Sequence, residues 1–109
     1  MFKPEVVVRF AGEMNQDRLD ALRSALSLRR TGRLGDDWDE IFGDRSDDVP
    51  GGRLMILLIR DDSDGTWKWK VKVSSEDGVE VSSFQHLEDE VRSAVESVGL
   101  QVTGVWRRT

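Results

Sequence analysis

Residues able to catalyse a reaction or bind a metal are scarce in this sequence. His86 is the only histidine, cysteine is absent, and there is no Ser/His/Asp spacing, phosphate-binding loop or cluster of metal-ligand residues. Residues 61–65 resemble the acidic start of a calcium-binding loop. With Gly65 at the glycine position of such a loop, however, Arg60 takes the first ligand position and Val71 the last, and neither binds calcium. We therefore expect no metal, no cofactor and no enzymatic activity, with a cofactor-free enzyme in a dimer cleft as the less favoured alternative.

The segment over residues 35–52 is acidic and contains aromatic side chains. Trp38, Ile41 and Phe42 recur at the spacing of one helical turn, which predicts a short amphipathic helix within an insertion. Trp is a preferred anchor in protein interfaces, and the surrounding carboxylates would steer a basic surface towards it. The residues predicted to bind a partner are Asp36, Asp37, Trp38, Asp39, Glu40, Ile41 and Phe42.

Lysine and tryptophan alternate over residues 66–74, which predicts a strand with one basic face. That face carries Lys68, Lys70 and Lys72. Because a basic sheet face can bind a small ligand or RNA, these lysines define the alternative site. The tryptophans of this strand point to the opposite face, so we expect them to fill the core together with Trp106.

The composition suits a single domain, residues 1–109, with a densely charged surface. Charged residues make up 34% of the chain, against about 25% in an average globular protein. The net charge of −5 counts against binding to nucleic acid or to anionic lipid. Because there is no cysteine, signal peptide or long apolar run, we expect a cytoplasmic protein with no membrane contact. Twelve of the 16 basic residues are arginine, which is typical of a GC-rich bacterial or phage gene.

The order of the predicted elements points to an α+β fold. Apolar and β-branched runs predict strands at residues 5–10, 53–60, 66–74 and 101–107, and helical spacing predicts helices at 16–30 and from 82 or 83 to 98. This strand–helix–strand–strand–helix–strand order is that of ferredoxin-like folds. We therefore expect a two-layer sandwich with a four-stranded antiparallel sheet, in which residues 35–52 are an insertion between the first helix and the second strand.

The predicted strand over residues 54–59 is apolar on both of its faces. Two helices cover only one face of a sheet, so we expect the other face to need a cover. Trp38, Ile41 and Phe42 could cover it from within the chain, whereas a second copy or another protein could cover it from outside. The predicted function is therefore a non-catalytic protein–protein interaction module. An inhibitory or immunity-type protein that binds a basic partner or self-associates would be one form of it.

Overall fold

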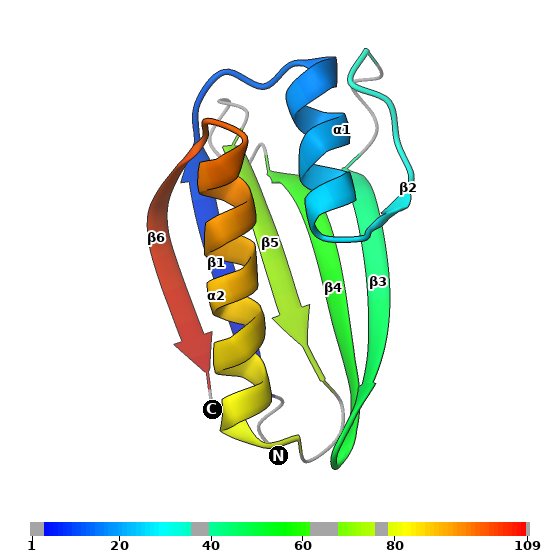
Figure 1. The fold of residues 1–109 in the computed structure, drawn as a ribbon, viewed down its shortest axis with the longest axis vertical. Helices are drawn as coiled ribbons and strands as arrows, with labels where there is room; N and C mark the ends of the chain where they lie inside the picture. Colours follow the sequence, from blue (N-terminus) through cyan, green and yellow to red (C-terminus); the bar gives the residue numbers. More distant parts are fainter. Residues whose placement is uncertain (1–3, 36–39, 62–67, 76–78, 109) are drawn as a thin grey trace.

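A single sheet with two helices makes up the part of the chain that the computed structural model describes, residues 4–35, 40–61, 68–75 and 79–108. In chain order the elements are β1 (Glu5–Ala11), α1 (Gln16–Ala25), β2 (Arg29–Arg30), β3 (Ile41–Val49), β4 (Gly52–Asp61), β5 (Lys68–Ser74), α2 (Val81–Ser97) and β6 (Gln101–Arg108). The strands are antiparallel and lie in the order β2-β3-β4-β5-β1-β6. Both helices pack on the same face of this sheet (Figure 1).

The expected α+β class, with two helices and an antiparallel sheet, is confirmed, but the expected four-stranded ferredoxin-like sandwich is wrong. The sheet has six strands, because β2 and β3 extend it beyond β4. Both added strands arise from segments that the sequence predicts as helix or as insertion. The sheet therefore has two more strands than the expected four-stranded sheet, although the number of helices is the expected two.

β3 replaces the helical turn predicted in the acidic segment. It runs antiparallel to β4 and joins it through a tight turn at Pro50 and Gly51, where Gly51 has a φ of 94°. Two of its positions that face the helices hold Arg45 and Asp47 instead of apolar residues. The alternation of apolar and polar residues that marks a strand is therefore missing from this part of the sequence.

α1 begins as predicted and ends earlier. Asn15 caps its start, because Asn15 Oδ1 accepts a hydrogen bond of 2.8 Å from the backbone N–H of Arg18. The helix stops at Ala25 and not at Arg30, since Ser27 adopts a left-handed φ of 53° and the chain then turns into β2.

α2 begins at Val81, one or two residues before the predicted start, with Glu80 as its N-cap residue and no side-chain cap. Its end near Gly99, which has a φ of 83°, agrees with the prediction. Among the described residues, neither helix combines the length and the apolar character needed to cross a membrane.

The hydrophobic core lies between the helices and the sheet. Every second residue of β4 faces the helices there, and so do the alternate residues of β1 and β5. The fully buried side chains of this core include Val8, Leu19, Leu22, Leu26, Phe42, Leu54, Ile56, Leu58, Val71, Val73 and Val91. The remaining residues of β4 point to the other face of the sheet, which we call the uncovered face because no described helix or strand packs on it.

Candidate interaction site

The uncovered face carries a row of side chains that runs across all six strands. The pairing register sets these residues next to one another: Arg29, Asp44, Leu57, Lys72, Val7 and Trp106. A second row beside it consists of Ile41, Ile59, Lys70 and Arg9. The face therefore combines an apolar part on β4, joined by Ile41 of β3, with a basic part on β5, β1 and β6. The other outward residues of β3 are polar: Asp44, Ser46 and Asp48.

Several apolar side chains of this face remain in contact with solvent. The exposed fractions are 44% for Ile41, 45% for Met55 and 49% for Trp106. Leu57 and Ile59 between them are half-buried. The expectation that the apolar run in β4 leaves one apolar side of the sheet uncovered thus agrees with the described part of the chain.

Trp106 lies on the uncovered face, so the prediction that it fills the core is wrong. The cause is an irregularity in the pairing of β1 with β6: Arg9 is opposite Gly104, whereas Phe10 is opposite Val102. Thr103 is the extra residue of this bulge, which reverses the side to which the following residues point. Val102 therefore packs against the core, and Trp106 lies opposite Val7 on the outer side.

Five cations lie close together on this face, and we call them the basic band: Arg9, Lys68, Lys70, Lys72 and Arg108. The predicted alternation of the lysines with core residues in β5 is confirmed by the register. Arg9 and Arg108 were not among the predicted site residues. Arg9 could have been found from its spacing to Val7 along β1, but Arg108 depends on the bulge in β6.

The carboxylate of Glu5 forms ion pairs within the basic band. Its Oε2 lies 3.0 Å from Arg108 Nη2, and its Oε1 lies 3.7 Å from Lys72 Nζ. Arg108 also stacks over the indole of Trp106, with its guanidinium carbon 5.7 Å from the ring centroid. These contacts hold three of the side chains in defined positions beside the tryptophan.

A hollow of about 290 Å³ opens at the end of the face where the bulge lies. Its lining includes three members of the basic band, Arg9, Lys68 and Lys70, together with Thr103 from the bulge. Among the described residues, Phe10, Ala11 and Trp69 also line it. A concave site with three cations on its wall favours an anionic group, since opposite charges attract more strongly where solvent is partly excluded.

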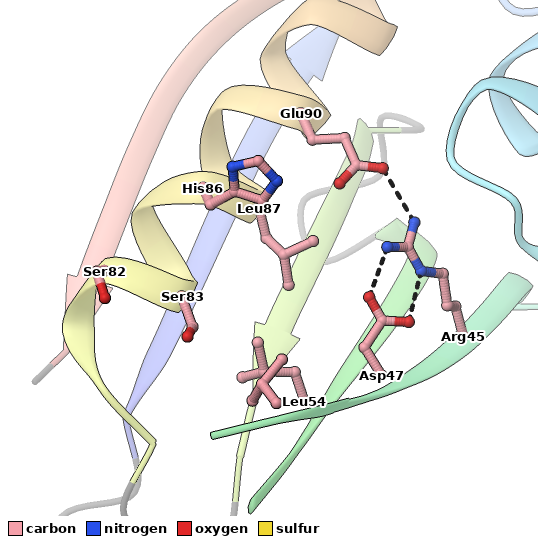
Figure 2. A pocket seen from close by; sticks show the side chains of 9 residues that line it. Arg45, Asp47, Leu54, Ser82, Ser83, His86, Leu87 and Glu90 are labelled. Carbon is pink, nitrogen blue, oxygen red and sulfur yellow. Dashed lines mark hydrogen bonds and ion pairs between the residues drawn. The ribbon is translucent and has the colours of Figure 1, made fainter. Parts of the chain in front are cut away.

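A second pocket, of about 320 Å³, lies on the helix side between α2 and the β3–β4 hairpin (Figure 2). The side chain of Arg45 crosses it: Nε donates to Asp47 at 2.8 Å, and Nη1 donates to Glu90 at 3.0 Å and to the carbonyl of Leu26 at 2.7 Å. These hydrogen bonds lower the pKa of Asp47 and raise the pKa of Arg45. Both groups therefore stay ionised, and they tie β3 to both helices.

The rest of that pocket is lined by residues with no comparable network. Ser82, Ser83 and His86 form its wall on α2, with Leu54 and Leu87 at its floor (Figure 2). His86 is exposed. The charged groups of the pocket are used for fixing the hairpin against α2, so we regard the pocket as a structural junction.

The predicted partner-binding cluster is divided by the structure. Phe42 is completely buried in the core and so cannot anchor a partner in the folded protein, which corrects that prediction. Ile41 lies on the uncovered face, and Glu40 is exposed, with its carbonyl accepting a 2.7 Å hydrogen bond from the N–H of Arg60. Outside the described residues lie Asp36, Asp37, Trp38, Asp39, Trp67 and residues 62–65 of the segment that resembles a calcium-binding loop.

Comparison with known proteins places the chain in no family. No protein-family model matches the sequence, and no curated protein matches it. The surface itself is therefore the guide to function.

Proposed function

We propose that this protein is a non-catalytic protein-interaction module that binds its partner on the uncovered face. The observation that carries the proposal is the exposure of Ile41 by 44% and of Met55 by 45% on one sheet face, with Leu57 and Ile59 between them. Trp106, exposed by 49%, lies on the same face but is separated from Leu57 by Lys72 and Val7. Isolated apolar residues are normal on a protein surface, but a continuous set on one face is typical of an interface.

The two edge strands of the sheet are unsuited to pairing with a strand of a partner, which favours a partner that docks on the face. The edge strand β2 has only two residues. The other edge strand, β6, is irregular at its bulge and ends in Arg107 and Arg108. Short strands, bulges and charged side chains are the features by which proteins prevent pairing at sheet edges. The face is thus the more suitable surface for a partner.

The size of the face also fits a stable interface. Six strands about 4.8 Å apart, with β4 rising about 3.3 Å per residue over ten residues, give an area of roughly 600–800 Å². A standard protein–protein interface buries about 800 Å² on each partner. The apolar side chains gather on β4, and charged residues lie on the strands to either side of it, which suits an interface that combines apolar and charged contacts.

RNA binding on the lysine side of the same face is the second candidate. The position of Trp106 favours it, because an aromatic side chain beside lysines can stack on a base. The apolar part on β4 with Ile41 counts against it, since aliphatic side chains offer bases no stacking surface. An inhibitory or immunity-type role in a bacterium or phage stays a prediction, as do a basic partner for the acidic segment and the cytoplasm as location.

Site-specific photo-crosslinking tests the proposal. A benzophenone amino acid replaces Met55 on the uncovered face or, as a control, the exposed His86 on α2, and the protein is irradiated in the cells that produce it. We expect a discrete protein adduct from position 55 that is absent from position 86 and is lost when Leu57→Lys is added. Adducts of the same kind from both positions, or none from position 55, would contradict the proposal.

A further inference from the structure

The chemistry of the uncovered face points to the kind of partner that it binds, on the basis of the proposed function. We infer that the partner is a different protein whose contact surface presents Asp and Glu side chains to the basic band, next to an apolar part that meets Leu57 and Trp106. The carboxylates enter the hollow lined by Arg9, Lys68 and Lys70. This partner has the opposite charge to the basic one that the acidic segment predicts.

The distribution of charge is the first argument. The chain has a net charge of −5, yet Arg9, Lys70, Lys72 and Arg108 lie on the adjacent strands β5, β1 and β6 of one face. All the described lysines of the chain belong to this band. A basic surface on an acidic protein steers acidic partners to that surface and speeds their association.

A like-charged pair within the band is the second argument. Arg9 is directly opposite Lys70 in the pairing of β1 with β5, and both side chains point to the uncovered face. Like charges in directly opposite positions destabilise a sheet. Both residues also interact within the chain, so an incoming acid competes with those contacts. A carboxylate bound between Arg9 and Lys70 would contact both cations, and the guanidinium can hold it with two hydrogen bonds.

The hollow supplies the third argument, because it gives the carboxylate a defined place. It lies at the bulge, where Thr103 is out of register with β1, and its lining combines the three cations with the apolar residues Phe10, Ala11 and Trp69. Apolar walls lower the local dielectric, which strengthens the attraction between a carboxylate and the cations. The side chain of Asp or Glu brings its charge on a short apolar stem and suits such a lining.

A protein fits the whole face better than the two other occupants. A single-stranded nucleic acid would use several stacking aromatics, but Trp106 is the aromatic side chain that the described part of this face exposes, and Arg108 already packs on it. A second copy related by a twofold axis perpendicular to the strands would place its own basic band against the first, and like charges disfavour that contact. An acidic protein with an apolar patch complements both halves of the face.

A peptide-binding experiment tests this inference with defined probes. The probes are fluorescently labelled peptides of alternating Glu and Leu, the matching peptide with Gln in place of Glu, and single-stranded oligo(dT). Fluorescence anisotropy measures Kd at low and high salt, and backbone NMR shifts map the binding site. The double variant Lys70→Gln/Lys72→Gln removes two charges from the band, and Arg30→Gln/Arg33→Gln removes two elsewhere as a matched control.

We expect the Glu peptide to bind the uncovered face at least about tenfold more tightly than the Gln peptide, a difference of about 1.4 kcal/mol. The lysine double variant should lose about tenfold in affinity, the arginine control should lose little, and salt should weaken binding. The inference is overturned if the Glu and Gln peptides bind equally, if oligo(dT) binds more tightly than the Glu peptide, or if the protein sediments as a dimer that Leu57→Lys dissociates. If position 55 still gives a crosslinked adduct but the Glu peptide does not bind, the proposed interaction module stands and only the acidic nature of the partner is wrong. If the adduct is also absent, the proposed function itself is wrong.

Discussion

Phe42 of β3 and Trp69 of β5 meet edge to face beneath the helices, with their ring centroids 5.1 Å apart. β4 separates these two strands in the sheet, so the contact ties the added strand β3 to the centre of the fold. The guanidinium of Arg60 lies over the Phe42 ring, 4.8 Å from its centroid. An aromatic residue from the acidic segment thus serves the core and not a partner.

This contact predicts that Phe42 and its neighbour Ile41 contribute very differently to the free energy of unfolding. Phe42→Ala should lower the free energy of unfolding by about 3–5 kcal/mol, because it leaves a cavity against Trp69. Ile41→Ala, one residue away on the uncovered face, should cost less than about 1 kcal/mol. Urea unfolding followed by circular dichroism measures both. Similar losses for the two variants would place Phe42 outside the core and contradict the structure.

Gly32 should resist substitution because of its backbone. Its φ is 75°, and a Cβ atom there would lie 2.6 Å from the carbonyl oxygen of Ile41. We expect Gly32→Ala to cost about 1–3 kcal/mol from left-handed strain and steric overlap. A Cβ atom at Gly35 would meet no other atom within 4 Å, so Gly35→Ala is the control and should change stability by less than about 0.5 kcal/mol. Thermal melting of the two variants gives the comparison, and equal melting temperatures would count against the geometry at Gly32.

Arg45 should contribute more to stability than an arginine in an exposed ion pair. Arg45→Met leaves Asp47, Glu90 and the carbonyl of Leu26 without their donor, which should cost about 1–3 kcal/mol. Arg53→Met removes the partner of Asp48 in a pair whose side chains are 63% and 84% exposed, so the loss should stay below about 1 kcal/mol. Chemical unfolding of both variants measures the difference. A smaller loss for Arg45→Met than for Arg53→Met would show that the junction between β3 and the helices is not needed.

Glu88 should make the stability depend on pH in the acidic range. Its oxygens accept hydrogen bonds of 2.6 and 2.7 Å from Arg107, which lower the pKa of Glu88 below its ordinary value of 4.5. The folded state therefore binds fewer protons than the unfolded state, and the stabilisation is present at neutral pH and is lost as the pH falls below about 4.5. Glu88→Gln should cost about 1 kcal/mol at pH 7 and flatten this part of the pH profile. Melting temperatures between pH 7 and pH 3 are the measurement, with the exposed Glu96→Gln as control; an unchanged profile in the Glu88 variant would contradict the assignment.

Local sequence patterns predicted several elements of the fold correctly. The apolar run of β4 and the alternation in β5 are visible in the sequence because each strand's pattern depends on its own residues. β3 was missed because its inward positions are occupied by Arg45 and Asp47. Their partial burial is accommodated because Arg45 binds Asp47 and also donates to Glu90 and to the carbonyl of Leu26, and these last two groups come from segments distant in sequence.

The sequence by itself determined the α+β class, the start of α1 at Asn15, the shared face of Lys68, Lys70 and Lys72, and the presence of an apolar strand side that two helices leave uncovered. These features follow from local periodicity and capping. Only the tertiary structure decided that Phe42 is in the core and that Trp106 joins the lysines. The physical reason is register: the bulge between β1 and β6 and the pairing of β3 with β4 choose the side to which each residue points, and both depend on contacts between strands far apart in the chain.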